Sequence, residues 1–221
     1  MREIVLDTET TGLEPEAGHR IVELACLELV NHLPTGRLKR WYFNPERDMP
    51  ADAVAVHGLT ADFLGSQPRF AEIADELLAF VDGARLVIHN AEFDLKFLNA
   101  ELARAGRTPL PLGLAIDTLT IARAKFPGAP ASLDALCRRF AIDNSARSLH
   151  SALLDAELLS EVYLELIGGR QSDLALAAGA IAAAAILVRE PRPARPHAPS
   201  AEEVAAHALL IGRLANPLWR Q

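Results

Sequence analysis

The chain contains 221 residues, of which 50% are hydrophobic and 23% are charged, so it can form one domain of ordinary size with a modest extension. The formal net charge of -7 argues against a protein that coats duplex nucleic acid with a basic surface, but not against an enzyme that grips a few nucleotides through bound metal. Two cysteines, Cys26 and Cys137, are too few for a disulfide scaffold or a thiolate metal site, and we expect reduced thiols in a cytoplasmic protein.

Strands and helices alternate in the pattern predicted for residues 1–168. Strands are predicted at residues 2–6, 21–30, 38–43 and 84–88. The first three strands are closely spaced, and a turn-rich segment at residues 31–36 separates the second from the third. This spacing indicates an antiparallel meander. Helices are predicted at residues 70–81, 92–105, 117–126 and 151–167, with another that Ser132 caps. The fold class is therefore α/β, with a mixed sheet flanked by helices.

Two carboxylates, Asp7 and Glu9, follow the first predicted strand. Residues two positions apart on a strand point to the same face of the sheet. Like charges in a partly dry site raise each other's pKa unless a cation lies between them. The pair indicates a site for a divalent metal, although a pair of turn-capping acids is an equally good interpretation of these two residues alone.

Two later segments carry side chains that suit the same chemistry. Asp94 lies where a strand turns into a helix, and His150 and Asp155 lie at the front of the last long helix. Taken singly, Asp94 is more often a surface acid near a helix N-terminus, and His150 is more often a loop residue. Asp155 alone would be a solvated helix residue. The order of all these residues along the chain changes that interpretation.

Three motifs carry the resemblance: Asp7-Thr8-Glu9-Thr10-Thr11-Gly12-Leu13, His89-Asn90-Ala91-Glu92-Phe93-Asp94, and His150 with Asp155 five residues later. In this order they resemble the DEDDh family of 3′-5′ exonucleases. Within that family the chain is similar to the proofreading exonucleases of bacterial replicative polymerases, through Val56-His57-Gly58-Leu59, Asp117-Thr118-Leu119 and Ser132-Leu133-Asp134-Ala135-Leu136-Cys137. The resemblance covers nearly all of residues 1–168 and implies a ribonuclease H-like fold.

The resemblance also implies phosphodiester hydrolysis by two divalent ions, Mg²⁺ or Mn²⁺, held about 3.5–4 Å apart. In the family pattern Asp7 bridges both ions, and Glu9, Asp94 and Asp155 complete their ligands. His150 takes a proton from the attacking water as general base, a role that suits a side chain whose pKa lies near working pH.

A pocket for the terminal nucleotide is implied beside these ligands. The residues expected to bind the substrate are Thr10, Thr11, Gly12, Leu13, His57 and Phe93. For Phe93 a place in the apolar core is the more common role of such a residue. We expect His89 to be structural and Asn90 to brace the second motif.

The remaining chain is expected to connect this domain to partners. Residues 169–199 form a linker rich in Ala and Pro, which begins with Gln171–Leu176, a segment that resembles peptides that bind the bacterial sliding clamp. Residues 200–221 resemble the segment that binds the polymerase subunit, with a capping-box helix from Ser200 through Ile211 and Trp219 as an anchor. No membrane association is expected, because the uncharged stretch at residues 174–188 is shorter than the ~20 residues that span a bilayer.

These observations favour a proofreading exonuclease that acts on the single-stranded 3′ end of DNA, with a small accessory subunit as a further possible partner. An exonuclease that trims RNA or short oligonucleotides would use the same carboxylates, but it would have little use for the C-terminal segment. A non-catalytic connector between polymerase and clamp is the alternative from another class. A simple metal buffer is disfavoured, because the acids are spread over three distant motifs.

Overall fold

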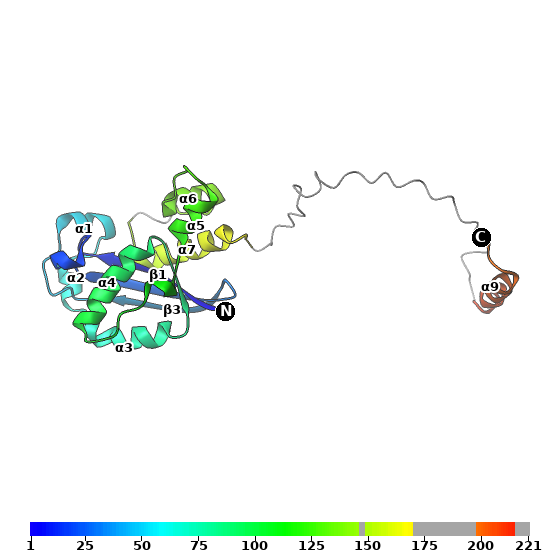
Figure 1. Ribbon diagram of the computed structural model, residues 1–221, viewed down its shortest axis with the longest axis horizontal. Helices are drawn as coiled ribbons and strands as arrows, with labels where there is room; N and C mark the ends of the chain where they lie inside the picture. Colours follow the sequence, from blue (N-terminus) through cyan, green and yellow to red (C-terminus); the bar gives the residue numbers. More distant parts are fainter. Residues whose placement is uncertain (146–148, 170–197, 215–221) are drawn as a thin grey trace. The chain divides into compact units, whose positions relative to one another are not determined.

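The computed structural model describes residues 1–145, 149–169 and 198–214 (Figure 1). These residues belong to two separate units, the first made of residues 1–145 and 149–169 and the second of residues 198–214. The predicted clamp-binding peptide Gln171–Leu176, most of the Ala/Pro-rich linker and Trp219 lie outside the described residues.

The first unit is built on a five-stranded mixed sheet in the order β3-β2-β1-β4-β5. Its strands are β1 (Arg2–Thr10), β2 (Ile21–Val30), β3 (Leu33–Tyr42), β4 (Arg85–Ile88) and β5 (Ala115–Asp117). β1, β2 and β3 form an antiparallel meander, whereas β4 is parallel to β1 and β5 is parallel to β4. The predicted α/β class and the predicted meander are therefore confirmed.

Helices cover both faces of the sheet, so the central strand β1 is buried on both sides. Ile4 and Leu6 pack in a core with α3 (Phe70–Val81) and α4 (Ala91–Arg104). Val5 points to the opposite face and packs in a second core with α7 (Ala152–Leu166). A third cluster joins α7 to α5 (Thr118–Lys125) and α6 (Leu133–Phe140). Burial on both faces explains why Ile4, Val5 and Leu6 form a continuous apolar run within β1.

The remaining elements are short. They are the helices α1 (Ala51–His57) and α2 (Ala61–Gly65) and the 3₁₀ turns η1 (Pro15–Ala17) and η2 (Leu112–Leu114). The second unit consists of helix α9 (Ala201–Arg213), in which Ser200 and Glu203 form the predicted capping box. No helix in the described ranges is both long and apolar enough to cross a membrane.

Several predicted boundaries are wrong, for local physical reasons. β1 continues to Thr10, because β2 pairs with it along its whole length, so Asp7 and Glu9 lie within the strand and not after it. β3 begins at Leu33 rather than at residue 38, because Asn31 and His32 reverse the chain with φ angles of 51° and 67°. The helices α1 and α2 and the strand β5 were not predicted.

One ion pair ties the start of β2 to α4. Arg20 donates to both carboxylate oxygens of Glu101, through Nε at 2.6 Å and through Nη2 at 2.9 Å, and Glu101 is only 2% exposed. Arg107 binds Asp75 with the same two-bond geometry at 2.6 and 2.7 Å, but the Asp75 side chain is 72% exposed. The two pairs therefore differ mainly in burial.

We predict that Arg20→Met lowers the free energy of unfolding by about 2–4 kcal/mol, because it leaves the Glu101 carboxylate buried without its main partner. Arg107→Met is the matched control and is expected to cost much less free energy of unfolding, because its pair is solvated. Urea unfolding of the two variants provides the comparison, and equal losses would show that burial of Glu101 carries no such penalty.

Candidate active site

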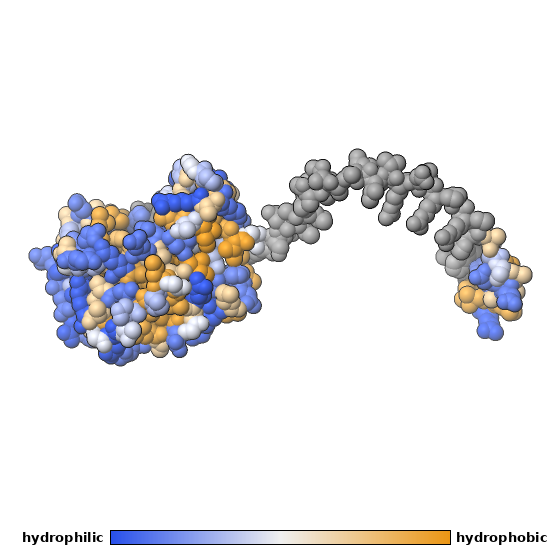
Figure 2. Space-filling view, viewed as in Figure 1, coloured by the Kyte–Doolittle hydropathy of each residue, from blue (hydrophilic) through white to orange (hydrophobic). Residues whose placement is uncertain are grey.

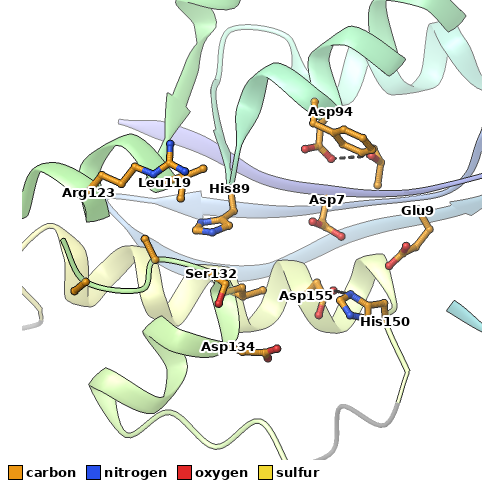
Figure 3. A pocket seen from close by; sticks show the side chains of 15 residues that line it. Asp7, Glu9, His89, Asp94, Leu119, Arg123, Ser132, Asp134, His150 and Asp155 are labelled. Carbon is orange, nitrogen blue, oxygen red and sulfur yellow. Dashed lines mark hydrogen bonds and ion pairs between the residues drawn. The ribbon is translucent and has the colours of Figure 1, made fainter. Parts of the chain in front are cut away.

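A cleft of about 590 Å³ lies at the edge of the sheet where β1 meets the starts of α4 and α7. The four acids and the histidine singled out in the sequence all line it: Asp7, Glu9, Asp94, His150 and Asp155 (Figure 3). Three motifs that are far apart along the chain thus converge on one cavity.

The strand β1 places its two acids toward α7. Side chains alternate along a strand, so Asp7 and Glu9 share the face of Val5, which packs in the α7 core, while Thr8 points to the opposite face. Glu9 is 8% exposed, in a cross-strand pair with Glu23 of β2. The alternation therefore delivers two carboxylates to one side of the central strand.

The turn from β4 into α4 places Asp94. Asn90 adopts a left-handed conformation (φ 70°), and its backbone N–H donates to Asp117 Oδ1 at 3.0 Å, so this residue braces the turn through its backbone. Asp94 is 4% exposed and accepts a hydrogen bond from Thr8 Oγ1 at 2.7 Å. Burial raises the pKa of Asp94 to about 7, which means that a nearby cation would strongly favour its ionised form.

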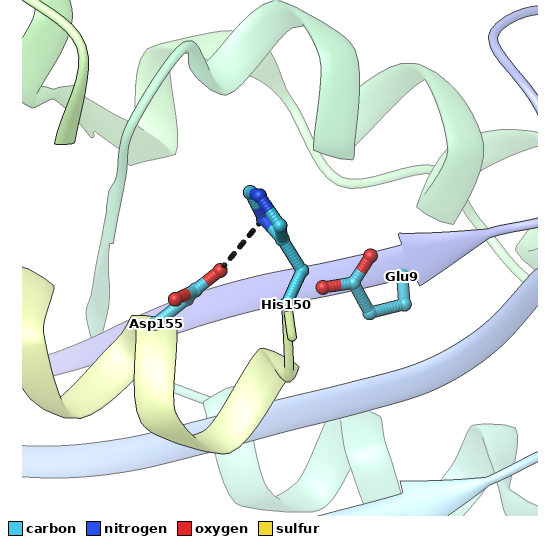
Figure 4. Close-up of side chains that lie close together, drawn as sticks. All are labelled: Glu9, His150 and Asp155. Atoms are coloured by element: carbon cyan, nitrogen blue, oxygen red, sulfur yellow. Dashed lines mark ion pairs between the residues drawn. The ribbon is translucent and has the colours of Figure 1, made fainter. Parts of the chain in front are cut away.

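The start of α7 places His150 and Asp155. Asp155 is 3% exposed, and its Oδ2 lies 3.3 Å from His150 Nδ1. One ligand atom from each of Glu9, His150 and Asp155 lies within 4.8 Å of the others (Figure 4). Together with Asp7 and Asp94, this is an oxygen-rich set of donors, which suits hard cations such as Mg²⁺ and Mn²⁺. The residues present therefore fit a divalent-metal site.

A second cleft of about 810 Å³ shares Glu9, Phe93 and His150 with the first. Every residue expected to bind the substrate lines it: Thr10, Thr11, Gly12, Leu13, His57 and Phe93. A β-carbon at Gly12 would lie 2.3 Å from Cε1 of His19, so a larger residue here would have to displace the His19 ring. The Leu13 side chain is exposed beside the cleft and can contact a planar ring.

His57 and Phe93 line this second cleft and also make contacts within the fold. His57 is buried and its Nδ1 accepts from the backbone N–H of Leu59 at 3.1 Å, so the neutral ring carries its proton on Nε2. Burial lowers the pKa of His57, which favours that neutral form. Phe93 packs against Phe97 with ring centroids 5.1 Å apart and also lines both clefts, so it contacts the apolar core on one side and the clefts on the other.

The far end of the first cleft was not predicted as functional. Arg123 of α5, Ser132 and Asp134 line it, and Arg123 brings a positive charge to a cavity rich in carboxylates (Figure 3). The sequence signal was present, because all three residues lie in or beside segments that carry the family resemblance, but nothing local distinguishes them from helix surface residues. His89 also lines this cleft, and its Nδ1 lies 2.9 Å from Thr118 Oγ1 in a structural contact.

Comparisons with known proteins agree with this geometry. Residues 4–163 match the sequence model of the RNase_T family, described as exonuclease. The DNA polymerase III subunit epsilon of Rickettsia felis is 58% identical over 175 residues, which cover 78% of this chain and 76% of that protein. The DNA polymerase III subunit epsilon of Escherichia coli K12 is 46% identical over 178 residues, which cover 77% of this chain and 73% of that protein.

Solved structures with low sequence identity share the fold. Exonuclease X in complex with 5′ overhanging duplex DNA superposes with a TM-score of 0.58 at 24% identity, covering 75% of this chain and 90% of that one. The nuclease domain of 3′hExo, a DEDDh family member bound to rAMP, superposes with a TM-score of 0.64 at 19% identity, covering 75% and 91%. The predicted ribonuclease H-like arrangement is confirmed.

The raised pKa of Asp94 predicts how the free energy of unfolding changes with pH when EDTA keeps metal ions away from the site. Because the folded pKa (about 7) lies above the ordinary value of 3.8, the folded state binds the extra proton between these values. The contribution of Asp94 to the free energy of unfolding is therefore largest below pH 3.8 and is lost as the pH rises toward 7. Asp94→Asn keeps the oxygen that accepts from Thr8 and should remove this loss.

Urea unfolding in EDTA at a series of pH values between 4 and 8 measures the difference in free energy of unfolding between Asp94→Asn and the parent chain. We expect the variant to gain relative stability as the pH rises. Asp75→Asn is the control: its partner Arg107 lowers the pKa of Asp75, so it titrates below this range and should leave the slope unchanged. If the difference in free energy of unfolding between Asp94→Asn and the parent chain does not vary with pH, the raised pKa of Asp94 is contradicted.

Proposed function

The chain belongs to the exonuclease family that includes the epsilon subunits of DNA polymerase III, and on this premise we propose how its residues remove mismatched nucleotides. It is a metal-dependent 3′-5′ exonuclease of the proofreading type. The observation that carries the mechanism is the convergence of four carboxylates and one histidine on a cleft that opens into a second, partly apolar cleft.

The four acids are proposed as the ligands of two divalent ions, Mg²⁺ or Mn²⁺. Asp7, Glu9, Asp94 and Asp155 supply oxygen atoms from three elements of a rigid scaffold, so they need little rearrangement to bind. When bound, the two metal ions would supply the Lewis acidity that lowers the pKa of a water molecule and stabilises the leaving 3′ oxygen.

His150 is proposed as the general base. Its Nδ1 contacts Asp155 Oδ2, and its side chain is 48% exposed, so it can reach a water at the rim of the acidic cluster. A histidine suits this role, because it accepts a proton near neutral pH and releases it again to solvent. Arg123 lies in the same cleft, where its positive charge suits the phosphate groups of a nucleic-acid strand.

The second cleft is proposed as the pocket for the unpaired 3′-terminal nucleotide. Thr10, Thr11 and Gly12 offer backbone and hydroxyl groups, while Leu13 and Phe93 offer apolar contacts to a base. Because the pocket lies beside the acidic cluster, a nucleotide bound there has its scissile phosphate next to His150. Selectivity for mismatches then arises from the ease with which a 3′ end leaves the duplex.

Digestion of matched single-stranded DNA and RNA oligonucleotides with 5′ labels tests this function. We expect deoxynucleoside monophosphates to be released from the 3′ end of DNA in the presence of Mg²⁺, and not in EDTA. Faster digestion of RNA would favour the trimming function. If the protein digests neither DNA nor RNA, the result would favour a non-catalytic connector between polymerase and clamp.

The same assay separates the proposed roles. Asp7→Ala should abolish both activity and Mn²⁺ binding, because Asp7 would be one of the carboxylates that hold the ions. His150→Ala should lower turnover by about 10²–10⁴-fold, the usual contribution of a general base, while Mn²⁺ binding persists. Unchanged turnover of His150→Ala would remove His150 from the base role.

Residues 200–221 are proposed to bind the alpha subunit of DNA polymerase III. The capping box fixes the start of α9, and apolar surface is exposed on this unit (Figure 2), which suits a groove on a partner: three exposed apolar side chains lie in the helix and a fourth follows it, namely Val204, Leu209, Leu210 and Leu214. Gln171–Leu176 is proposed to bind the sliding clamp. Residues 190–199, with the rest of the linker, would keep the exonuclease near the primer end at a high effective concentration.

Deletion of residues 190–221 should leave hydrolysis of single-stranded DNA intact, because the catalytic residues all lie in the first unit. Gel filtration with the purified alpha subunit should then show separate peaks, whereas the full chain co-elutes. Survival of the complex after deletion would exclude this tether. For the clamp, equal affinity of the full chain and a Gln171→Ala/Leu174→Ala variant in surface plasmon resonance would exclude the peptide.

A further inference from the structure

The backbone of His150 is bound to the end of α1. The N–H of His150 donates to the carbonyl of Val56 at 3.0 Å. Gly58, which follows in a left-handed conformation with φ 74°, lies under the side chain of Leu149: a β-carbon on Gly58 would lie 2.8 Å from Cδ1 of Leu149. Leu149 and the backbone N–H of His150 therefore both contact the C-terminal end of α1.

The residue after His150 is bound to the sheet. Ser151 Oγ accepts from Nη2 of Arg40 at 3.1 Å and lies 3.4 Å from Oε1 of Glu23, to which it donates. Arg40 Nε binds the same oxygen of Glu23 at 2.7 Å, and Glu23 is 1% exposed. The Ser151 hydroxyl is thus joined to an ion pair between β2 and β3 in which the Glu23 carboxylate is buried and the Arg40 side chain is partly exposed.

This hydroxyl has no role within its own helix. Ser151 is the N-cap residue of α7, but its side chain caps no backbone N–H of that helix. The side chain of His150 is 48% exposed, so packing around the ring does little to hold it. Apart from the contact of its ring with Asp155, its position depends on the backbone on either side, and a displacement of about 1 Å of a catalytic group can cost on the order of 10² in rate.

We propose that Gly58, Leu149 and Ser151 are positioning residues that clamp the His150 backbone from both sides and so place the ring beside the metal ligands. The proposal rests on the proposed role of His150 as general base. None of the three residues needs to touch the substrate or a metal ion for this role.

The sheet side of the clamp is tested with Ser151→Ala, which removes the hydroxyl and leaves the Arg40–Glu23 pair in place. We expect kcat to fall by about 10-fold or more, with KM and Mn²⁺ affinity unchanged. Ser151→Thr keeps a hydroxyl and should restore kcat. Ser160→Ala is the matched control, because Ser160 Oγ donates to the Glu157 carbonyl of the same helix at 2.7 Å, with no bond to another element among the described residues.

The helix side is tested with Gly58→Ala, whose new methyl group would collide with Leu149. Gly58→Ala should lower kcat, and Leu149→Ala in that background should recover part of the loss by removing the collision. Gly36→Ala controls for backbone strain, because Gly36 has φ 83° and no atom within 4 Å of the position of a β-carbon. A loss in Gly36→Ala equal to that in Gly58→Ala would overturn the helix side of the proposal.

The effects must also vanish when the base is absent. In a His150→Ala background, Ser151→Ala should cause no further loss of kcat, because it acts only through His150. A full additional loss in that background would overturn the clamp. If His150→Ala lowers kcat but Ser151→Ala does not, the clamp fails and the proposed function stands. If His150→Ala itself has no effect, the proposed role of His150 as general base fails, and the clamp fails with it.

Discussion

The cost of burying several carboxylates beside one another is the constraint on which this structure depends. Glu9, Asp94 and Asp155 are each less than one-tenth exposed, and they line one cleft with Asp7. Burying negative charge in such a place is costly unless a cation is bound there, and the burial that raises the pKa of Asp94 illustrates this cost. A protein that keeps this arrangement gives up stability in the absence of metal, and in return it has a site that binds divalent ions with little rearrangement.

The scaffold is arranged to hold these acids in place. β1 lies at the centre of the sheet, with helices on both faces, so its acids are fixed by packing on each side. β4 is parallel to β1, so its end delivers the start of α4 to the same edge of the sheet. Hydrogen bonds then fix the local geometry, from Thr8 to Asp94 and from Asn90 to Asp117. Each acid is therefore positioned by an element whose other contacts lie in the apolar cores.

The sequence was most informative where a signal is local. Alternation along β1 predicted that Asp7 and Glu9 share a face, and the caps at Ser132 and Ser200 are found as predicted. The long helices were located to within a residue or two at each end, because their apolar positions recur with helical spacing.

Features that depend on distant contacts were not predicted. Helix α1 begins after Pro50 without a side-chain cap and is seven residues long, too short for periodicity to identify it. The strand β5 has three residues and is defined by its pairing with β4. The link between Arg40 and Ser151 joins residues 111 positions apart, which no local pattern indicates. The positions of Arg123 and Asp134 in the cleft likewise follow from how α5 and α6 pack against α7.

The most direct measurement of the central claim is anomalous diffraction from crystals of the full chain grown with MnCl₂ and thymidine 5′-monophosphate. The account predicts two manganese peaks bounded by Asp7, Glu9, Asp94 and Asp155, with the thymine base in the cleft beside Leu13 and the phosphate toward His150. Manganese bound elsewhere, or a nucleotide outside that cleft with the four carboxylates free of metal, would contradict it.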